Sequence, residues 1–459
     1  MTTSAMEAPP QKLKRALGLP GLVLFGLTYL APVTVFTTYG LVTSITENHL
    51  PAAYLVALIA MLFTASSYGK MARAFPVAGS AYTYTQQTFG GGLGFLAGWT
   101  LMLDYLFLPM VNFMLIGLYA NTQLPDVPAW VFLLGALLLT LLLNIVGITL
   151  VNRVNIVIVT VSVLLAVVFV ALSLNYLGTN PSSAGLIEPF LPGGGLGAVF
   201  SGAAILALSF LGFDAVSTMS EEARNPRRDI PRAILLTTLI GGAIFIVVAW
   251  VGALVFPDWQ SFTSVDTAGV EVMARVGGQI FTSIFVAVYI VGAFGSGMAT
   301  QISVTRIIYA MGRDGVLPRI LGRLSVRFRT PVVAAVVVSL ISCLGFFLAL
   351  GDVFNMISFG ALFAFSIVNL AVVKHFLFPR GGRISPANLR DWITFGVLPL
   401  IGFALTIWLW TSLVPSAFAV GLIWMGAGII VLAIMTRGFT RKAPIMDFSE
   451  AEIPAENTR

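Results

Sequence analysis

Long apolar runs separated by short polar segments fill almost the whole chain. Each run is close to the ~20 residues that an α-helix needs to cross the ~30 Å hydrocarbon core of a bilayer. The pattern therefore predicts an all-α, multi-pass membrane protein with twelve spanning helices. The predicted spans are residues 20–43, 52–74, 92–119, 128–148, 155–177, 196–220, 233–256, 278–311, 331–351, 354–376, 391–411 and 416–436.

Two of the predicted spans contain residues that interrupt a helix. Pro32 stands in the middle of the first span, where it removes a backbone donor and clashes with the preceding turn. In the sixth span, Gly212 and Asp214 lie at the corresponding depth. Backbone groups freed at a break need protein, water or a ligand as partners. Interrupted helices at matching places in two halves of a chain indicate a transporter site near the midplane.

Ionisable side chains deep inside a predicted span are rare in this chain. The predicted spans contain two ionisable residues well inside them, Asp104 in the third span and Asp214 in the sixth. Such residues are costly in a membrane and often functional. Packing alternatives stay open, because Asp104 could bond to tyrosine or asparagine neighbours and Asp214 could cap a half-helix. The two breaks and the two acids together favour a solute pathway.

Composition and charge agree with a membrane environment. Only 10% of the residues are charged, against about 25% in typical soluble proteins. If the N-terminus lies inside, Arg275 is the one of the 25 lysines and arginines that falls outside. This bias predicts that both termini are cytoplasmic in a plasma or inner membrane. Because the basic residues are dispersed between apolar runs, the net charge of +6 does not indicate nucleic-acid binding.

The sequence shows no catalytic or metal-binding constellation. His49 and His375 fall at opposite membrane edges, so we expect no metal site, no cofactor and no enzyme activity. The glycine string 193–198 precedes a span instead of following a strand, and Gly69-Lys70 lacks a P-loop around it. A nucleotide site and an ATP-driven pump are therefore excluded. A channel or solute sensor of transporter ancestry remains an alternative.

Three motifs resemble the amino acid–polyamine–organocation superfamily. They are residues 212–234 with the string Ser-Glu-Glu-Ala-Arg-Asn-Pro at 220–226, residues 75–84, and residues 309–318. Residues 26–36 and 103–112 look like the corresponding segments of bacterial putrescine importers. The resemblance implies a LeuT-type 5+5 inverted repeat in which helices 1 and 6 are broken. The implied organisation is a cytoplasmic tail 1–19, repeat one 20–177, repeat two 196–376, helices 11 and 12 in 391–436, and a cytoplasmic tail 437–459.

The same resemblance implies import by alternating access, driven by an ion gradient that is usually one of protons. Ser296 and Thr300 are hydroxyls near the place where related folds bind sodium. Some proton-coupled relatives carry a lysine in helix 5, and residues 155–177 contain none. The coupling ion therefore stays open, with protons favoured by the family. A sodium-coupled or exchange-type amino acid permease is the main alternative.

The first break also bears on the substrate. Related amino acid permeases bind a carboxylate with free N–H groups at a glycine-rich break, whereas this chain has Ala31-Pro32-Val33-Thr34. Because this break has one N–H donor fewer and no glycine, it favours an amine over a carboxylate as the group bound there. The putrescine importers carry an aspartate where this chain has Thr37, which counts against a long diamine. The expected substrate is a small cationic or zwitterionic amine. It could be a monoamine, an amine with a polar tail, or an amino acid whose carboxylate is not bound by the first break.

These considerations define the candidate site. We expect Asp214 and nearby carbonyls to accept an ammonium group, with Asp104 as a second cation partner or the proton-coupling group. Aromatic walls would add cation–π attraction of about 0.5–2 kcal/mol. The candidate substrate-binding residues are Tyr29, Ala31, Pro32, Thr34, Thr37, Asp104, Tyr105, Phe210, Gly212, Phe213 and Asp214, and the candidate coupling residues are Asp104 and Asp214.

Overall fold

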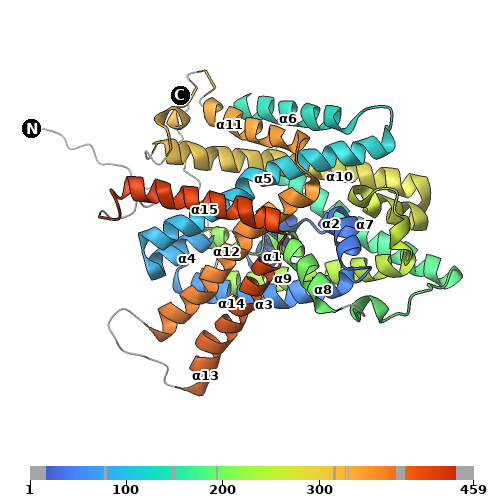
Figure 1. The fold of residues 1–459 in the computed structure, drawn as a ribbon, viewed down its shortest axis with the longest axis horizontal. Coiled ribbons are helices and arrows are strands. Elements are labelled where there is room, and N and C mark those ends of the chain that lie inside the picture. The colour runs from blue at the N-terminus through green and yellow to red at the C-terminus, as the bar shows by residue number, and fades with distance from the viewer. Residues whose placement is uncertain are drawn as a thin grey trace, which may run out of the picture.

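The structure is a computed structural model in which the long helices pack side by side in one bundle (Figure 1). It describes residues 17–76, 80–146, 151–192, 195–313, 317–325, 327–328, 330–378 and 388–440. Most of both predicted tails lies outside these residues, as do 193–194 of the glycine string and 77–79 and 314–316 of the family motifs. Apart from one isolated bridge between Leu17 and Ala223, the described secondary structure is helical.

Within the described residues, ten helices are long and apolar enough to cross a membrane. Two of them are assembled from several short segments, and each of the others consists wholly or almost wholly of one long α-helix. The single helices are α3 (Leu50–Ala74), α5 (Gly91–Gln123), α6 (Ala129–Val146), α7 (Val151–Thr179), α9 (Pro226–Val255), α10 (Ala268–Arg313), α12 (Leu350–Leu377) and α15 (Pro415–Met435). The assembled ones are α8 (Leu196–Leu206) with η2 (Ala207–Phe210) and η3 (Ala215–Glu221), and α13 (Leu389–Trp392) with η8 (Ile393–Val397) and α14 (Leu398–Thr411).

The two remaining predicted spans also fall on helices. The first is a pair, α1 (Leu19–Leu30) and α2 (Thr34–Ile45), bent by 47° at the break around Pro32. The other is the shorter apolar helix α11 (Val332–Ser342) with η7 (Cys343–Phe346). Each apolar run of the sequence therefore coincides with a helical element, which confirms the all-helical, multi-pass class.

Short helices in the loops escaped the sequence pattern because they are too brief or too polar to form an apolar run. The most important is α4 (Ser80–Phe89), which packs against α5 and α12. The helix α10 also begins ten residues before the predicted run, and Gly278 with φ 65° marks a kink inside it. The other short elements are η1 (Glu188–Phe190), η4 (Trp259–Ser261), η5 (Val265–Thr267) and η6 (Arg319–Gly322).

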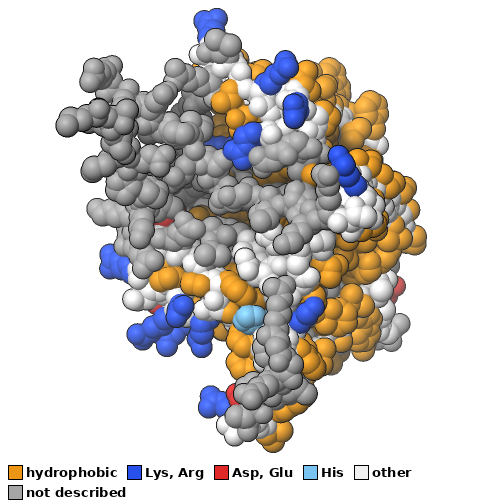
Figure 2. All heavy atoms as spheres, turned by 90° about the vertical axis from the view of Figure 1, so that its left-hand side faces the viewer, with side chains coloured by type: hydrophobic (Ala, Val, Ile, Leu, Met, Phe, Trp, Pro, Cys, Tyr) orange, Lys and Arg blue, Asp and Glu red, His pale blue; other side chains and the backbone are white. Residues whose placement is uncertain are grey.

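The exposed surface of the bundle is apolar where it would face lipid. On α6 the side chains of Leu138 and Leu142 are more than half exposed, and on α15 those of Ile423 and Ile430 are too. Lysine and arginine side chains instead gather on the face that lies at the left of Figure 1, as Figure 2 shows. An apolar belt with basic residues gathered at one end is the arrangement expected of a membrane protein.

The last helix is fastened to α5 by two tryptophans. Trp99 of α5 donates its indole N–H to the carbonyl of Trp424 at 2.9 Å, and Trp424 donates to the carbonyl of Trp99 at 2.8 Å. The two rings also stack, with centroids 5.0 Å apart. Gly428 lies directly under the Trp99 ring, where a Cβ would come within 2.5 Å of it. This clasp holds α15 close to the helix that carries Asp104.

We expect Trp424→Phe to destabilise the protein by about 1–2 kcal/mol, because it removes the indole hydrogen bond to the Trp99 carbonyl and part of the ring stacking. Thermal unfolding in detergent measures the effect. Trp130→Phe is the matched control, since that side chain is 56% exposed. Equal melting temperatures for Trp424→Phe and Trp130→Phe would contradict a stabilising clasp.

Candidate functional site

The break in the first span is built as the sequence predicts. The helix α1 ends at Leu30, and Ala31 adopts the left-handed conformation with φ 45°. The N–H of Ala31 donates to the Leu27 carbonyl, and the N–H of Thr34 donates to the Ala31 carbonyl at 2.8 Å. Pro32 has no N–H, and the N–H groups of Ala31 and Thr34 are already used within the chain, which leaves that of Val33. The break therefore offers a carboxylate a single N–H group.

The break in the sixth span lies directly against the first one. Gly212 has φ 121°, and a Cβ there would come within 2.8 Å of the Tyr29 Cβ and 2.9 Å of the Leu30 nitrogen. Both the backbone angle and the contact therefore require glycine. No described backbone N–H donates to the carbonyls of Leu211 and Gly212, which leaves these acceptors available.

Asp214 is 9% exposed and its carboxylate is bonded within the protein. One oxygen accepts the N–H of Gly212 at 3.1 Å, and the other accepts the hydroxyl of Ser80 at 3.3 Å. Ser80 is the first residue of α4 and has φ 48°, a conformation rare for residues other than glycine. A helix missed by the sequence pattern thus reaches the sixth-span break.

Asp104 differs from Asp214 in its bonding. It lies on α5, is 6% exposed, and its Oδ1 atom is buried without a hydrogen-bond partner. Asp104, Asp214, Tyr29 and Tyr105 lie close enough together for the charged form of one to act on another, so the fold brings these four predicted residues to one place. Within the described part of the chain neither carboxylate has an ion-pair partner.

The site is open on the side of Tyr29. This side chain lies at the junction of the two breaks, yet it is 39% exposed, and Tyr105 is half-buried. Thr37 points elsewhere, because its hydroxyl donates to the Thr34 carbonyl at 2.7 Å and it is buried. Phe210 and Phe213 are fully buried and pack on other aromatic rings, Phe210 on Phe245, and Phe213 on Tyr68 and Phe365.

The opposite side is closed by five aromatic residues, which we call the aromatic plug. Phe36 packs edge-on against Phe169 and Phe285, with ring centroids 5.0 and 5.2 Å apart. Tyr119 stacks on Tyr289 and donates its hydroxyl to the Phe36 carbonyl at 3.1 Å. These residues come from α2, α5, α7 and α10, and none is more than 6% exposed. Four helices therefore seal one side of the site.

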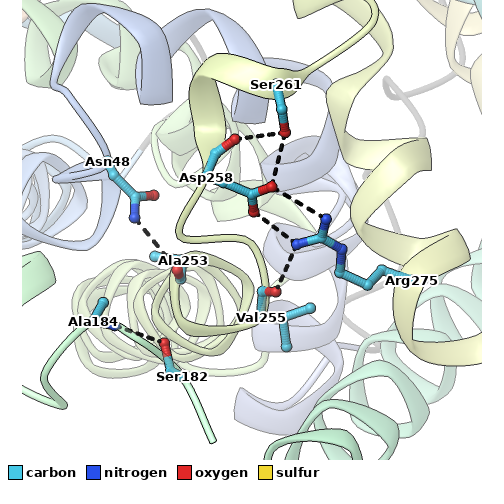
Figure 3. A network of polar contacts seen from close by, with 8 residues as sticks. All are labelled: Asn48, Ser182, Ala184, Ala253, Val255, Asp258, Ser261 and Arg275. Atoms are coloured by element: carbon cyan, nitrogen blue, oxygen red, sulfur yellow. Dashed lines mark hydrogen bonds and ion pairs between the residues drawn. The ribbon is translucent and has the colours of Figure 1, made fainter. Parts of the chain in front are cut away.

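The loop between α9 and α10 covers the plug. Gly40 of α2 touches the Val265 carbonyl, and Gly269 of α10 touches the Phe36 carbonyl, so each contact excludes a side chain. Arg275 pairs with Asp258 at 2.8 Å and donates to the Val255 carbonyl (Figure 3).

The partners of Asp258 hold its carboxylate in the charged form. The hydrogen bond from Arg275 keeps the pKa of this carboxyl below its usual value. A depressed pKa means that the ion pair is present at neutral pH and is lost only as the pH falls through that lowered pKa. The loop is thus fastened at one end by the ion pair and at the other by the two glycine contacts.

Sequence reasoning missed the contribution of α4 and α3 to the site. Tyr68 of α3 and Tyr84 of α4 lie next to Asp214 and interact with it electrostatically. Their rings meet edge-on with centroids 5.9 Å apart. The segment containing Ser80 and Tyr84 was noted only as a family motif. No residue pattern within it indicates that it folds back onto a helix break more than a hundred residues away.

Comparison with known proteins agrees with this architecture. The family model described as amino acid permease matches residues 22–440. The chain belongs to this family, within the amino acid–polyamine–organocation superfamily. It is 39% identical over 94% of its length to the low-affinity putrescine importer PlaP of Escherichia coli (strain K12), covering 96% of that protein.

More distant permeases with other substrates also match. The chain is 31% identical over 80% of its length to the branched-chain amino acid permease BcaP of Bacillus subtilis (strain 168), covering 82% of it. It is 25% identical over 95% of its length to a methylthioribose transporter of the same organism, covering 96% of it. These relatives are transporters and not enzymes, as the sequence predicts for this permease.

We expect Gly40→Ala to open the closed side. The added methyl group overlaps the Val265 carbonyl, and overpacking of this kind costs about 1–3 kcal/mol. The population of the closed arrangement, and with it the rate of uptake into proteoliposomes, should fall at least about fivefold. Gly135→Ala is the control, because a Cβ at Gly135 meets nothing within 4 Å. Wild-type uptake by Gly40→Ala would show that this contact is not needed.

Proposed function

We propose that this permease is a secondary active transporter that imports a small amine-bearing solute by alternating access, with protons as the coupling ion. The observation that carries the proposal is the pair of buried carboxylates, Asp104 and Asp214, at the meeting point of two broken helices. Buried charges are costly without a partner. A cationic substrate or a proton is the partner that a transport cycle supplies.

Twelve spans in a LeuT-type inverted repeat fit the helices described above. The repeats would comprise residues 20–177 and 196–376, with helices 11 and 12 at 391–436. The broken elements are then the first of each repeat, which is where an inverted repeat places a midplane site. In this arrangement both termini are cytoplasmic, the aromatic plug faces outside, and the opening at Tyr29 faces the cytoplasm.

Two observations support this orientation. Lysine and arginine side chains gather at one end of the bundle (Figure 2), and cytoplasmic loops are enriched in these residues. The chain before α1 is also bonded to the chain after the sixth span, where Leu17 donates to Glu222 at 3.1 Å and Arg224 donates to Leu17 at 2.9 Å. The start of the first repeat and the arginine-rich exit of the sixth span therefore lie together.

The choice of an amine rests on the site more than on the family. The relatives include permeases named for putrescine, for branched-chain amino acids and for methylthioribose, a neutral sugar derivative. What separates these solutes is charge. A site with two carboxylates, no paired cation and few free donors at its first break favours an ammonium group over a carboxylate.

Proton coupling fits the same pair of acids. The hydroxyl of Thr300 donates to the Ser296 and Gly297 carbonyls of its own helix at 2.8 and 3.1 Å, as membrane threonines commonly do, so it gives no separate support to a sodium site. A carboxylate that is buried but reachable from one side at a time is suited to carry a proton. The candidate residues Tyr29, Ala31, Pro32 and Thr34 would then line the path beside Tyr105, Phe210, Gly212 and Phe213. The alternative is sodium-coupled or exchange transport.

We expect the double variant Asp104→Asn/Asp214→Asn to lose uptake driven by an imposed pH gradient in proteoliposomes. Removing both charges removes the groups that would bind the amine and the proton. Asp126→Asn is the control, because Asp126 is exposed in the turn before α6. Full gradient-driven uptake by the double variant would rule out both roles.

Thermal-shift measurements on the purified wild type distinguish the substrate classes. A ligand present at one hundred times its Kd adds about 2.7 kcal/mol to the stability of the folded state. We expect stabilisation by amines, including putrescine, and none by methylthioribose. Stabilisation by zwitterionic amino acids alone would overturn the amine assignment, and flux that never saturates would indicate a channel.

A further inference from the structure

The two buried aspartates are not equivalent, although the sequence suggests that they are. Asp214 accepts two hydrogen bonds from protein donors, one on each carboxylate oxygen. Asp104 has a buried Oδ1 with no partner at all. A buried carboxylate oxygen left without a donor is costly, so Asp104 is the group with unused bonding capacity.

The bonds of Asp214 connect two separate parts of the chain. Gly212 and Asp214 lie at the break just before η3, whereas Ser80 belongs to α4 in a different loop. The Asp214 carbonyl is also used, because Ser217 donates both its N–H and its hydroxyl to it, at 3.0 and 2.6 Å. We call the contact of Gly212, Asp214 and Ser80 the latch. Its bonds hold the sixth-span break in shape and fasten α4 to it.

The backbone at Ser80 supports this reading. Its φ of 48° is unfavourable for a residue with a side chain, and such strain persists only where the surroundings enforce it. Ser80 is also only 6% exposed. The strained conformation directs the hydroxyl to the Asp214 carboxylate. Ser80 is therefore a positioning residue of the break and does not contact the solute.

Asp104 lies instead beside the open part of the site. It interacts electrostatically with Tyr29, the most exposed member of the group, and with Tyr105. The Leu211 and Gly212 carbonyls, which accept no described backbone N–H, lie on the break that packs against Tyr29. An ammonium group has three donors, and one carboxylate oxygen with two free carbonyls would satisfy them.

We infer that Asp104 alone accepts the ammonium group of the solute, whereas Asp214 and Ser80 form a latch between the sixth-span break and α4. The inference rests on the proposed function, and it narrows the substrate class. With a single anionic anchor, the site selects aliphatic primary amines by one ammonium group. A second ammonium finds no second free carboxylate.

Binding of a matched pair of ligands tests the single anchor. Putrescine and 1-butylamine have the same carbon chain and differ by one ammonium group. A second buried ion pair would strengthen binding at least about 30-fold, so we expect their Kd values for the wild type to differ by less than that. A larger preference for putrescine would overturn the single anchor. If the wild type binds neither amine, the proposed function itself fails.

Single variants test the division of roles. We expect Asp104→Asn to raise the Kd for 1-butylamine at least about 30-fold. Asp104→Glu keeps the charge and should bind 1-butylamine more tightly than Asp104→Asn does. Asp214→Asn should raise the Kd for 1-butylamine less than about tenfold, because its amide oxygen still accepts the Gly212 N–H. The reverse order of Asp104→Asn and Asp214→Asn would assign the anchor to Asp214. Melting temperatures check that each variant is folded.

Ser80 variants test the latch separately from binding. Ser80→Ala removes the hydroxyl, and Ser80→Gly removes it while accepting the positive φ. We expect both to lower the turnover rate of uptake and leave the Kd for 1-butylamine within about threefold of wild type. Ser342→Ala is the control, since its hydroxyl bonds to the Val338 carbonyl of its own helix. Unchanged turnover in both Ser80 variants would show that there is no functional latch. A loss of measurable 1-butylamine binding would place Ser80 in the binding site.

Discussion

Backbone polar groups cannot be left without partners inside a membrane, and each of the two broken helices of this permease meets part of that requirement with groups of its own segment. The sixth-span break places Gly212 in van der Waals contact with Tyr29 and Leu30 at the end of α1. The Gly212 N–H finds its acceptor in Asp214, two residues along the chain. Lipid offers neither donors nor acceptors, so the Leu211 and Gly212 carbonyls need a partner from water, a solute or another part of the protein. The location of the site follows from this constraint.

The same contact explains why the site is open on one side only. The helix α2 starts at the first break and carries Phe36 into the aromatic plug, while α1 ends at the break with Tyr29 facing the opening. A change in the 47° bend between the two helices would therefore move the plug and the binding residues together. The glycine contacts at Gly40 and Gly269 let the loop above α2 follow it closely. In the proposed transport cycle, access and binding would thus be linked by one bent element.

The family membership does not by itself decide the solute. Permeases named for a diamine, for branched-chain amino acids and for a thiosugar all match most of this chain. A shared fold does not fix the solute, which depends on the side chains that line the site. In this permease the candidate site holds an aspartate on α5 with a buried oxygen that has no partner, and a second aspartate whose oxygens both accept hydrogen bonds.

The helical spans, the breaks at Pro32 and Gly212, and the burial of the two acids could be predicted from the sequence, because the length of an apolar run and the effect of proline are local properties. The boundaries of the repeats and the coupling ion stay predictions. The role of α4 could not be predicted, because Ser80 and Asp214 are 134 residues apart in the chain. Which aspartate is bonded and which is free, and which side of the site the aromatic plug closes, depend on donors and rings contributed by distant helices. Only the tertiary structure brings these groups together.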